Sequence, residues 1–267
     1  MKNSIKEIQQ IVLKKTRPDD RKIKGIWAID YFHMPTDSQL FDLKLILSQT
    51  TGHGCAYSPE KNINRDLLKS LINNDIFTAK NYDNIDYSIK ISVLDSLYGT
   101  LYPPTGEKEE NKGNSIDKNK WRTKIVLNEI QNLIGKNSSV KKILNVGVVA
   151  SFMETLRNEG YDIVGSDLDD DVVNSKIAGT KIVHGKQSPF LARKVDLVIA
   201  TGMTIATKTI DRIITECNMS GTKLIVFAET GHNFANYYIE NGVDVYISES
   251  FPFYSMEGSS TITICRK

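Results

Sequence analysis

The side chains best suited to chemistry near neutral pH are histidines with a second reactive group close by in the sequence. His53 and Cys55 lie two positions apart between glycines, and imidazole and thiolate are ligands that zinc and related metals prefer. A closed zinc site needs four ligands, so a distant residue such as His33 or His232 would have to complete it. The alternative is a glycine-rich turn that buries Cys55. We predict His53 and Cys55 as ligands of a metal site assembled across the chain.

A carboxylate and an imidazole follow the predicted strand over 223–228. Glu229 and His232 stand at its carboxyl end, where such a pair can act in proton transfer or metal binding. Glu249 ends a neighbouring predicted strand and could face the same crevice. An exposed loop with Asn233 as a helix cap would use the same residues. Glu229 and His232 are the catalytic candidates.

A third group of residues has the spacing of a nucleotide site. Asn145 and Gly147 end one predicted strand, and Asp167 ends the next strand, twenty residues beyond Gly147. In α/β folds this arrangement binds a nucleotide through a helix N-terminus and a carboxylate on the ribose. Thr201 and Gly202 end a further strand and would let a ligand approach the backbone. Helix capping and turn geometry are the alternatives for these residues.

The first 104 residues have the pattern of a small α+β domain. Runs rich in Ile, Leu and aromatic residues predict two strands, over 23–32 and 41–49. Apolar residues on most sides of 86–98 predict a buried helix that ends before Gly99. Residues 105–120 contain almost no apolar side chain and are predicted to form a solvated linker.

Residues 121–267 alternate predicted strands with amphipathic helices. Continuous Ile, Val and Leu runs are typical of parallel strands covered on both faces. The last two strands are about ten residues apart, which is too short for a crossover helix and predicts an antiparallel hairpin. The predicted fold class is α/β: a small α+β domain followed by a mostly parallel sheet with an antiparallel C-terminal hairpin.

This mixed pattern is nearer to S-adenosylmethionine methyltransferases than to dehydrogenases. Because the Gly147 turn also lacks a glycine-rich fingerprint, S-adenosylmethionine is favoured over a nicotinamide dinucleotide.

Composition limits the partners and the compartment. The 267 residues have a net charge of +2, which signals no nucleic-acid-binding face. No apolar run is long enough to span a membrane, and the N-terminus has no apolar segment of a signal peptide. Three cysteines at distant positions argue for reduced thiols and a cytoplasmic protein. A small molecule is the expected partner, and homo-oligomerisation is left open.

Five stretches, taken in order and spacing, resemble the family of putative heavy-metal chelation proteins: 52–56, 91–98, 143–148, 196–202 and 240–244. The resemblance implies an enolase N-terminal-like domain over 1–104 and a Rossmann-like ligand-binding domain over 121–267. It also implies an active site in a cleft between the two. A role in the synthesis or handling of a metal chelator, with a divalent metal or a metal complex bound, follows from it.

Three functions therefore compete. The first is binding of a small molecule or metal complex in chelator metabolism. The second is an S-adenosylmethionine-dependent transferase, in which Asn145, Gly147 and Asp167 hold the nucleoside and Glu229 and His232 act on the acceptor. The third is a ligand-binding module without catalysis. The sequence does not decide whether the protein is an enzyme.

Overall fold

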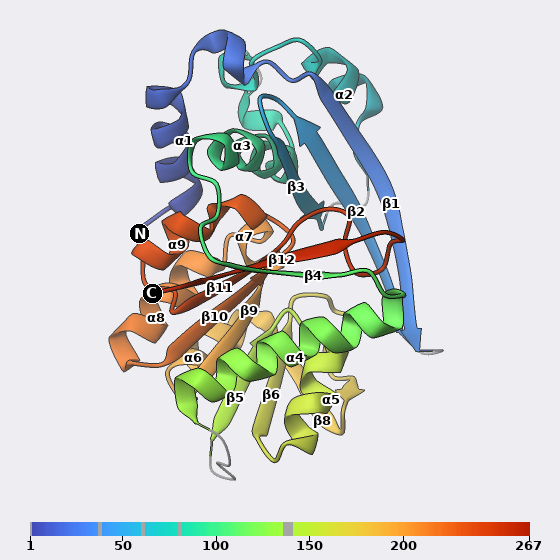
Figure 1. The fold of residues 1–267 in the computed structure, drawn as a ribbon, viewed down its shortest axis with the longest axis vertical. Coiled ribbons are helices and arrows are strands. Elements are labelled where there is room, and N and C mark those ends of the chain that lie inside the picture. Colours follow the sequence, from blue (N-terminus) through green and yellow to red (C-terminus); the bar gives the residue numbers. More distant parts are fainter. Residues whose placement is uncertain (1, 37–38, 60–61, 80–81, 136–140) are drawn as a thin grey trace.

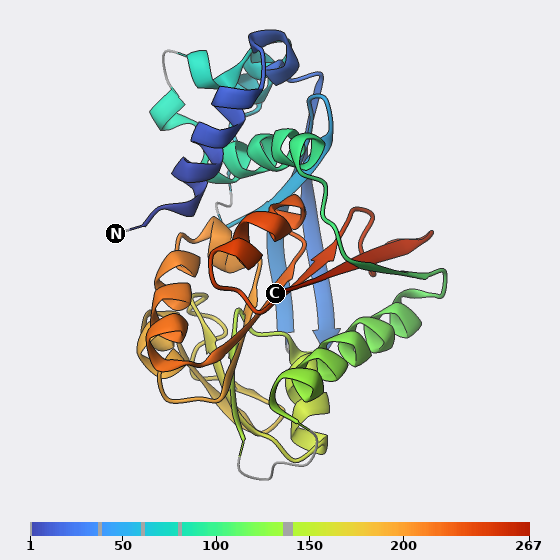
Figure 2. The ribbon, with the colours of Figure 1, turned by 60° about the vertical axis from the view of Figure 1, so that its left-hand side comes forward.

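The computed structural model describes residues 2–36, 39–59, 62–79, 82–135 and 141–267, with the side chains of 31–43 outside that description. His33 is among these, so its proposed part in a metal site lies outside the described residues. The chain forms two lobes; described residues up to 102 build the upper one in Figure 1, and their first two strands reach down beside the lower lobe. Figure 2 shows the same two lobes from another side.

The first lobe contains a three-stranded antiparallel sheet in the order β1-β2-β3. Its elements are α1 (Ser4–Lys15), η1 (Pro18–Arg21), β1 (Gly25–Thr36), β2 (Gln39–Gln49), β3 (His53–Ser58), α2 (Arg65–Leu71), η2 (Ile76–Thr78), η3 (Tyr82–Asn84) and α3 (Tyr87–Leu101). The two strands expected from the sequence are present. The glycine-flanked segment of His53 and Cys55 is a strand, β3, rather than a turn.

Helix α3 begins as expected and ends later than expected. The Asp86 side chain accepts hydrogen bonds from the backbone N–H groups of Ser88 and Ile89, at 2.7 and 3.3 Å, and caps the helix. The helix then runs past Gly99 to Leu101, so the predicted end before Gly99 is wrong. A Cβ at Gly99 would collide with the side-chain amide of Asn233 in the second lobe. This glycine therefore allows a close approach between lobes and does not terminate the helix.

The second lobe contains a nine-stranded sheet in the order β4-β12-β11-β10-β9-β5-β6-β8-β7. Its strands are β4 (Glu107–Asn111), β5 (Lys142–Val146), β6 (Asp162–Asp167), β7 (Lys176–Ile177), β8 (Thr180–His184), β9 (Leu197–Thr201), β10 (Lys223–Ala228), β11 (Val245–Glu249) and β12 (Ser260–Arg266). The helices are α4 (Ser115–Ile134), α5 (Ala150–Asn158), η4 (Gly185–Gln187), α6 (Ser188–Ala192), α7 (Met203–Ala206), α8 (Ile210–Ser220), η5 (His232–Phe234) and α9 (Ala235–Glu240).

The predicted fold class is confirmed. Strands β5, β6, β8, β9, β10 and β11 are parallel, and β12 pairs antiparallel with β11. Counted along the chain from β5, the parallel strands lie in the order 3-2-1-4-5-6. This is the order of the doubly wound dinucleotide-binding sheet. The departure from an all-parallel sheet is confined to the two edges, where β12 and β4 lie on one side and β7 on the other.

The segment 105–120 differs from the solvated linker that its composition predicts. Strand β4 pairs antiparallel with the outer edge of β12, and helix α4 begins at Ser115. Its polar side chains have partners, since Glu109 accepts a hydrogen bond from Trp121 Nε1 at 2.9 Å and Glu107 pairs with Arg266 at 3.0 Å. Charged side chains are suited to an edge strand because they discourage further pairing.

The two faces of the large sheet have separate cores. Leu144 and Val198 face a cluster that includes helices α8 and α9, whereas their neighbours Ile143 and Ile199 face α4 and α5. This alternation follows from the two-residue period of a strand. The first cluster continues into α1 and α3 of the first lobe, so the lobes share one apolar core.

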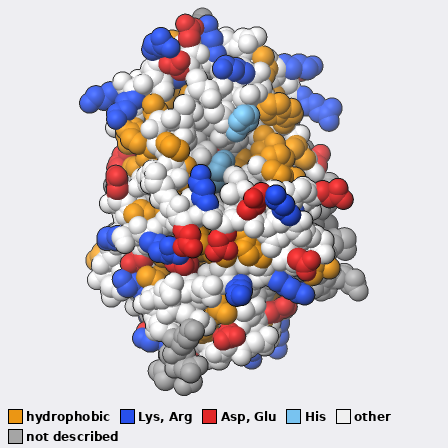
Figure 3. Space-filling model, viewed as in Figure 1, with side chains coloured by type: hydrophobic (Ala, Val, Ile, Leu, Met, Phe, Trp, Pro, Cys, Tyr) orange, Lys and Arg blue, Asp and Glu red, His pale blue; other side chains and the backbone are white. Residues whose placement is uncertain are grey.

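Within the described residues, every helix is too short or too polar to cross a lipid bilayer. Lys and Arg side chains are interspersed with Asp and Glu side chains on the face of the molecule seen in Figure 3.

Substitution of Gly99 tests whether it serves the contact between lobes. Gly→Ala in a helix usually adds about 1 kcal/mol of stability. Here we expect Gly99→Ala to lower the free energy of unfolding by about 1–3 kcal/mol, because the new methyl group meets Asn233. In an Asn233→Ala background the same substitution should become neutral or stabilising. Chemical denaturation of the four proteins measures this coupling, and a stabilising Gly99→Ala in the native background would contradict it.

Candidate functional site

The loop that follows β10 covers the free edge of β3 and so joins the two lobes. The backbone N–H of Gly231 donates to the carbonyl of Cys55 at 3.2 Å. Two residues along β3, the backbone N–H of Tyr57 donates to the hydroxyl of Thr230 at 2.9 Å. These bonds satisfy backbone groups that an open sheet edge would leave unpaired. They also bring the His232 side chain to Cys55.

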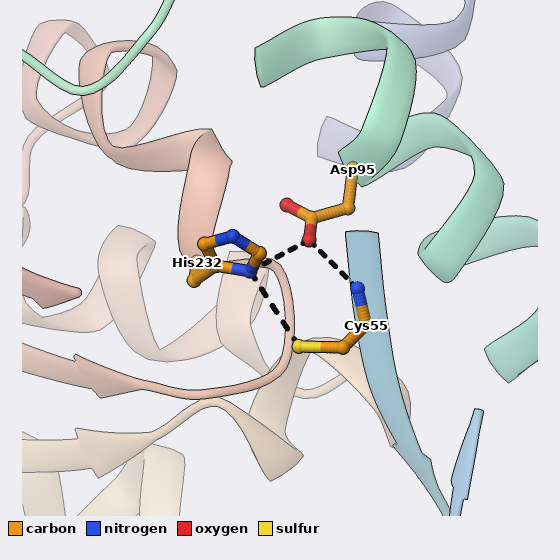
Figure 4. A group of neighbouring side chains, drawn as sticks. All are labelled: Cys55, Asp95 and His232. Atoms are coloured by element: carbon orange, nitrogen blue, oxygen red, sulfur yellow. Dashed lines mark hydrogen bonds and ion pairs between the residues drawn. The ribbon is translucent and has the colours of Figure 1, made fainter. Parts of the chain in front are cut away.

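Cys55, Asp95 and His232 form a compact group at this junction (Figure 4). Cys55 Sγ lies 3.5 Å from His232 Nδ1, and the same nitrogen lies 2.9 Å from Asp95 Oδ2. One potential ligand atom from each of the three residues falls within 4.8 Å of the others. Cys55 and Asp95 are buried, and the His232 side chain is 12% exposed.

Asp95 was not predicted from the sequence, although it organises this group. It lies on α3, is completely buried, and accepts hydrogen bonds from the backbone N–H groups of Cys55 and Asn233, at 3.0 and 2.8 Å. The sequence signal is an acidic residue in the middle of a helix that is predicted to be largely buried. A buried carboxylate has to be paired, so such a position indicates a partner elsewhere in the chain.

The arrangement does not fit a cysteine nucleophile with its base. In a catalytic relay, the acid and the nucleophile contact opposite nitrogens of the histidine ring. Here Asp95 Oδ2 and Cys55 Sγ both approach Nδ1 of His232. Burial raises the pKa of the Cys55 thiol well above its usual value, and nearby carboxylates raise it further. A reactive thiol needs the opposite shift, so Cys55 lacks the electrostatic surroundings of a nucleophile.

Two of the three separations between the potential ligand atoms can be compared with those around a zinc-like ion. Metal–ligand distances of about 2.0–2.3 Å put tetrahedral sulfur and nitrogen ligands about 3.5 Å apart, and nitrogen and oxygen about 3.3 Å apart. The observed Sγ–Nδ1 distance of 3.5 Å meets the first value. The Nδ1–Oδ2 distance of 2.9 Å is a hydrogen bond that would have to widen by about 0.4 Å. Three protein ligands leave one position for water or a small molecule.

The sequence predicts His53 and Cys55 as a pair of metal ligands. In the structure Cys55 lies instead beside Asp95 and His232. His53 opens β3 with an exposed side chain, and its carbonyl accepts a hydrogen bond from the Asn233 amide at 3.1 Å. The expectation that His232 would reach Cys55 from a distance matches the arrangement found. The side chains of His53 and Cys55 lie on the same face of β3, because alternate residues of a strand point the same way.

A second charged group adjoins the first. The Glu229 carbonyl accepts a hydrogen bond from Cys55 Sγ at 2.9 Å, and its carboxylate pairs with Arg122 of α4 at 3.1 Å. Arg122 also pairs with Glu249 at 3.4 Å, and its guanidinium stacks on the ring of Tyr254 at 4.1 Å. Glu229 and His232 therefore have separate charged partners, and the two catalytic candidates do not form a direct acid/base pair.

Negative charge exceeds positive charge at this junction. Asp95, Glu229 and Glu249 are at most 14% exposed at the side chain; Glu229 and Glu249 pair with Arg122, and Asp95 pairs with the His232 imidazole. Burial raises the pKa of Glu249 to about 7, Arg122 opposes the shift and Glu229 adds to it. Arg122 Nε and Nη1 and Glu249 Oε2 are also buried with no hydrogen-bond partner among the described residues. The Glu249 carboxyl group can therefore exchange a proton near neutral pH.

The residues expected to bind a nucleotide cofactor do meet at the carboxyl ends of β5, β6 and β9. The polar atoms of Asp167 and Asn145 are used by the turn itself, whereas the Thr201 hydroxyl is buried with no hydrogen-bond partner among the described residues. Asp167 accepts hydrogen bonds from the backbone N–H groups of Val148 and Asp169, at 2.9 and 3.0 Å, and burial raises its pKa. Asn145 accepts one from the backbone N–H of Val149 at 2.9 Å.

The glycines of this turn allow close approaches. Gly147 has φ +71°, and a Cβ there would collide with the Thr201 hydroxyl. A Cβ at Gly202 would approach the Thr230 carbonyl to 2.8 Å. These positions therefore need glycine for local packing, whether or not a ligand binds.

One described pocket lies away from this chemistry. It measures about 280 Å³ and lies between β4 and α4. Its charges pair with one another, since Arg266 donates to Glu129 at 2.7 and 2.8 Å and pairs with Glu107 at 3.0 Å. This pairing ties the edge of the sheet to α4.

Comparison with known proteins agrees with this fold. Residues 132–227 match the model of a family described as putative heavy-metal chelation, DUF364. Two solved structures of DUF364 proteins with unknown function share the fold. The one from Desulfitobacterium hafniense has a TM-score of 0.57 and 13% identity, and covers 97% of this chain and 98% of its own. The one from Pyrococcus horikoshii has a TM-score of 0.55 and 12% identity, and covers 99% and 100%.

No curated protein matches the sequence significantly. The chain thus resembles the putative heavy-metal chelation family in its central segment, and DUF364 proteins in its whole fold.

Glu249→Gln tests the buried proton. A carboxyl whose pKa is about 7 when folded and about 4.5 when unfolded contributes its full stability below pH 4.5 and loses it as the pH rises to 7. We expect the variant and the native protein to have similar unfolding free energies at low pH. Above pH 7 the variant should be more stable by about 3 kcal/mol. Urea unfolding across this pH range measures the difference, and a difference that is independent of pH would contradict the raised pKa.

Proposed function

We propose that the protein binds a divalent metal ion, or a small-molecule complex of one, through Cys55, Asp95 and His232. The observation that carries the proposal is the convergence of one sulfur, one oxygen and one nitrogen atom within 4.8 Å at the junction of the two lobes. Thiolate, carboxylate and imidazole together suit zinc and its neighbours among the transition metals. The resemblance to the putative heavy-metal chelation family supports the same chemistry.

The charge at the junction also supports a cation. Glu229 and Glu249 contact one guanidinium, and Asp95 contacts the His232 imidazole, which leaves two negative charges uncompensated among these groups when all carboxylates are ionised and His232 is neutral. Uncompensated buried charge is costly. A divalent ion supplies the missing positive charge, and deprotonation of Cys55 then becomes favourable.

Three protein ligands would leave a coordination position open for a donor atom of a small molecule. We therefore propose that the site handles metal complexes, in the synthesis or transfer of a chelator, at the cleft expected between the two lobes. This role does not require catalysis by the protein. The three cysteines are buried and unpaired, which supports a reducing compartment such as the cytoplasm.

Metal titration of the purified protein tests the site. We expect zinc to bind with a stoichiometry of about one, and Co²⁺ to produce a thiolate-to-cobalt absorption band. Cys55→Ser should remove the band, and Cys55→Ser and His232→Ala should each weaken zinc binding by more than about a hundredfold. That exceeds the loss usual for a residue outside the coordination sphere.

Two variants serve as matched controls. Cys217→Ser removes a buried thiol on α8, and His53→Ala removes the exposed histidine on the strand of Cys55. Both should bind zinc as the native protein does. Loss of binding in His53→Ala alone would instead favour the ligand pair predicted from the sequence. No zinc binding by the native protein would refute direct coordination.

An S-adenosylmethionine-dependent transferase is the second candidate. Its support is the position of Asn145, Gly147 and Asp167 beside the point where the strand order reverses, between β5 and β9. A nucleoside would have to compete with the backbone for the Asp167 carboxylate.

Thermal unfolding with saturating S-adenosylmethionine tests the transferase, with a nicotinamide dinucleotide in parallel. A hundredfold excess over Kd adds about 2.7 kcal/mol of stability. A shift in Tm that Asp167→Ala removes would support the transferase, and no shift would contradict it.

A further inference from the structure

The carboxyl group of Glu249 lies close to the proposed metal ligands but contacts none of them directly. Contacts lead from Cys55 through the Glu229 carbonyl, at 2.9 Å, to the Glu229 carboxylate and then to Arg122 at 3.1 Å. Arg122 lies 3.4 Å from Glu249. Burial is the main reason that the pKa of the Cys55 thiol is raised, and the negative charges of Asp95, Glu229 and Glu249 add to the shift.

Three neighbouring segments contribute charged or polar groups to the surroundings of Glu249. Arg122 comes from α4 and Glu229 from the end of β10. The loop between β11 and β12 contributes the backbone N–H of Tyr254, which donates to Glu249 Oε1 at 2.7 Å. The other oxygen, Oε2, is buried with no hydrogen-bond partner among the described residues, although it faces Arg122. A buried carboxylate without its full set of hydrogen bonds is costly when charged, and once Glu249 is protonated the Glu229 carboxylate can accept its hydrogen bond.

From these contacts we propose that Glu249 is a proton-binding site coupled to the metal site, so that a divalent cation at Cys55, Asp95 and His232 displaces its proton. This inference rests on the proposed metal site. One guanidinium balances only one of the two carboxylates that contact it, and a proton neutralises the other. When a cation arrives nearby, Glu249 releases that proton to solvent as a carboxylate. The ligands lose their own protons separately, from Cys55 Sγ and His232 Nδ1.

The coupling makes metal retention dependent on pH near neutrality. Below a pH of about 7 Glu249 binds its proton in the metal-free protein, so zinc binding must displace it. Above that pH the carboxylate is already charged and attracts the cation. The protein would therefore hold the metal more tightly in a neutral or slightly alkaline medium, and release it on mild acidification.

Calorimetry of zinc binding in buffers with different ionisation enthalpies counts the released protons. At a pH of about 6 the native protein should release about one proton more per zinc ion than Glu249→Gln, and at a pH of about 8 this difference should shrink. When the pH falls from about 8 to about 6, the zinc affinity of the native protein should fall by up to about tenfold more than that of Glu249→Gln.

Glu129→Gln is the matched control, because Glu129 is also a buried carboxylate paired with an arginine, Arg266, at 2.7 Å. It should release as many protons as the native protein. Equal proton release by Glu249→Gln and the native protein would overturn the coupling and leave the metal site intact. Absence of zinc binding in the native protein would overturn both proposals.

Infrared spectroscopy gives a readout that does not need a folded variant. The metal-free native protein at neutral pH should have the carbonyl band of a protonated, buried carboxyl group. Saturating zinc should remove this band, and a band that persists would overturn the proposal. In Glu249→Gln, if that variant folds, the band should be missing without zinc.

Discussion

The structure depends on the contact between the free edge of β3 and the loop that follows β10. Backbone groups of Cys55 and Tyr57 on that edge bind Gly231 and Thr230. These bonds satisfy polar groups that are buried between the lobes, so their loss would leave several donors and acceptors unpaired at once. The same contact determines which side chains can meet, because it holds His232 beside Cys55.

Asp95 extends this contact to α3. Its carboxylate accepts from the backbone of both lobes and from the imidazole, with distances between 2.8 and 3.0 Å. The helix can approach so closely because Gly99, one turn further on, leaves room for Asn233. A glycine, a carboxylate and a sheet edge thus cooperate to bring three potential ligands together. Their position between lobes means that a bound metal would also hold the lobes together.

Much of the fold was predictable from the sequence. The two-residue alternation of Ile143 and Leu144 reflects a strand covered on both faces, and the short connection before β12 indicated its antiparallel direction. The errors came where tertiary contacts outweigh local preference. Strand β4 forms because β12 has a free edge, although its residues have little tendency to form a strand. Helix α3 passes Gly99 because the glycine serves a distant neighbour.

For the site, the sequence by itself determined the reactive groups: Cys55, His232, Glu229 and Glu249 are recognisable as residues at strand ends or between glycines. Only the tertiary structure decided their partners. Asp95 and Arg122 lie on helices and are far in sequence from the groups they contact. Pairing of buried charges depends on distances and exclusion of water, and both arise only when the lobes pack. Local sequence therefore specifies which chemistry is available, and packing specifies which of these side chains act together.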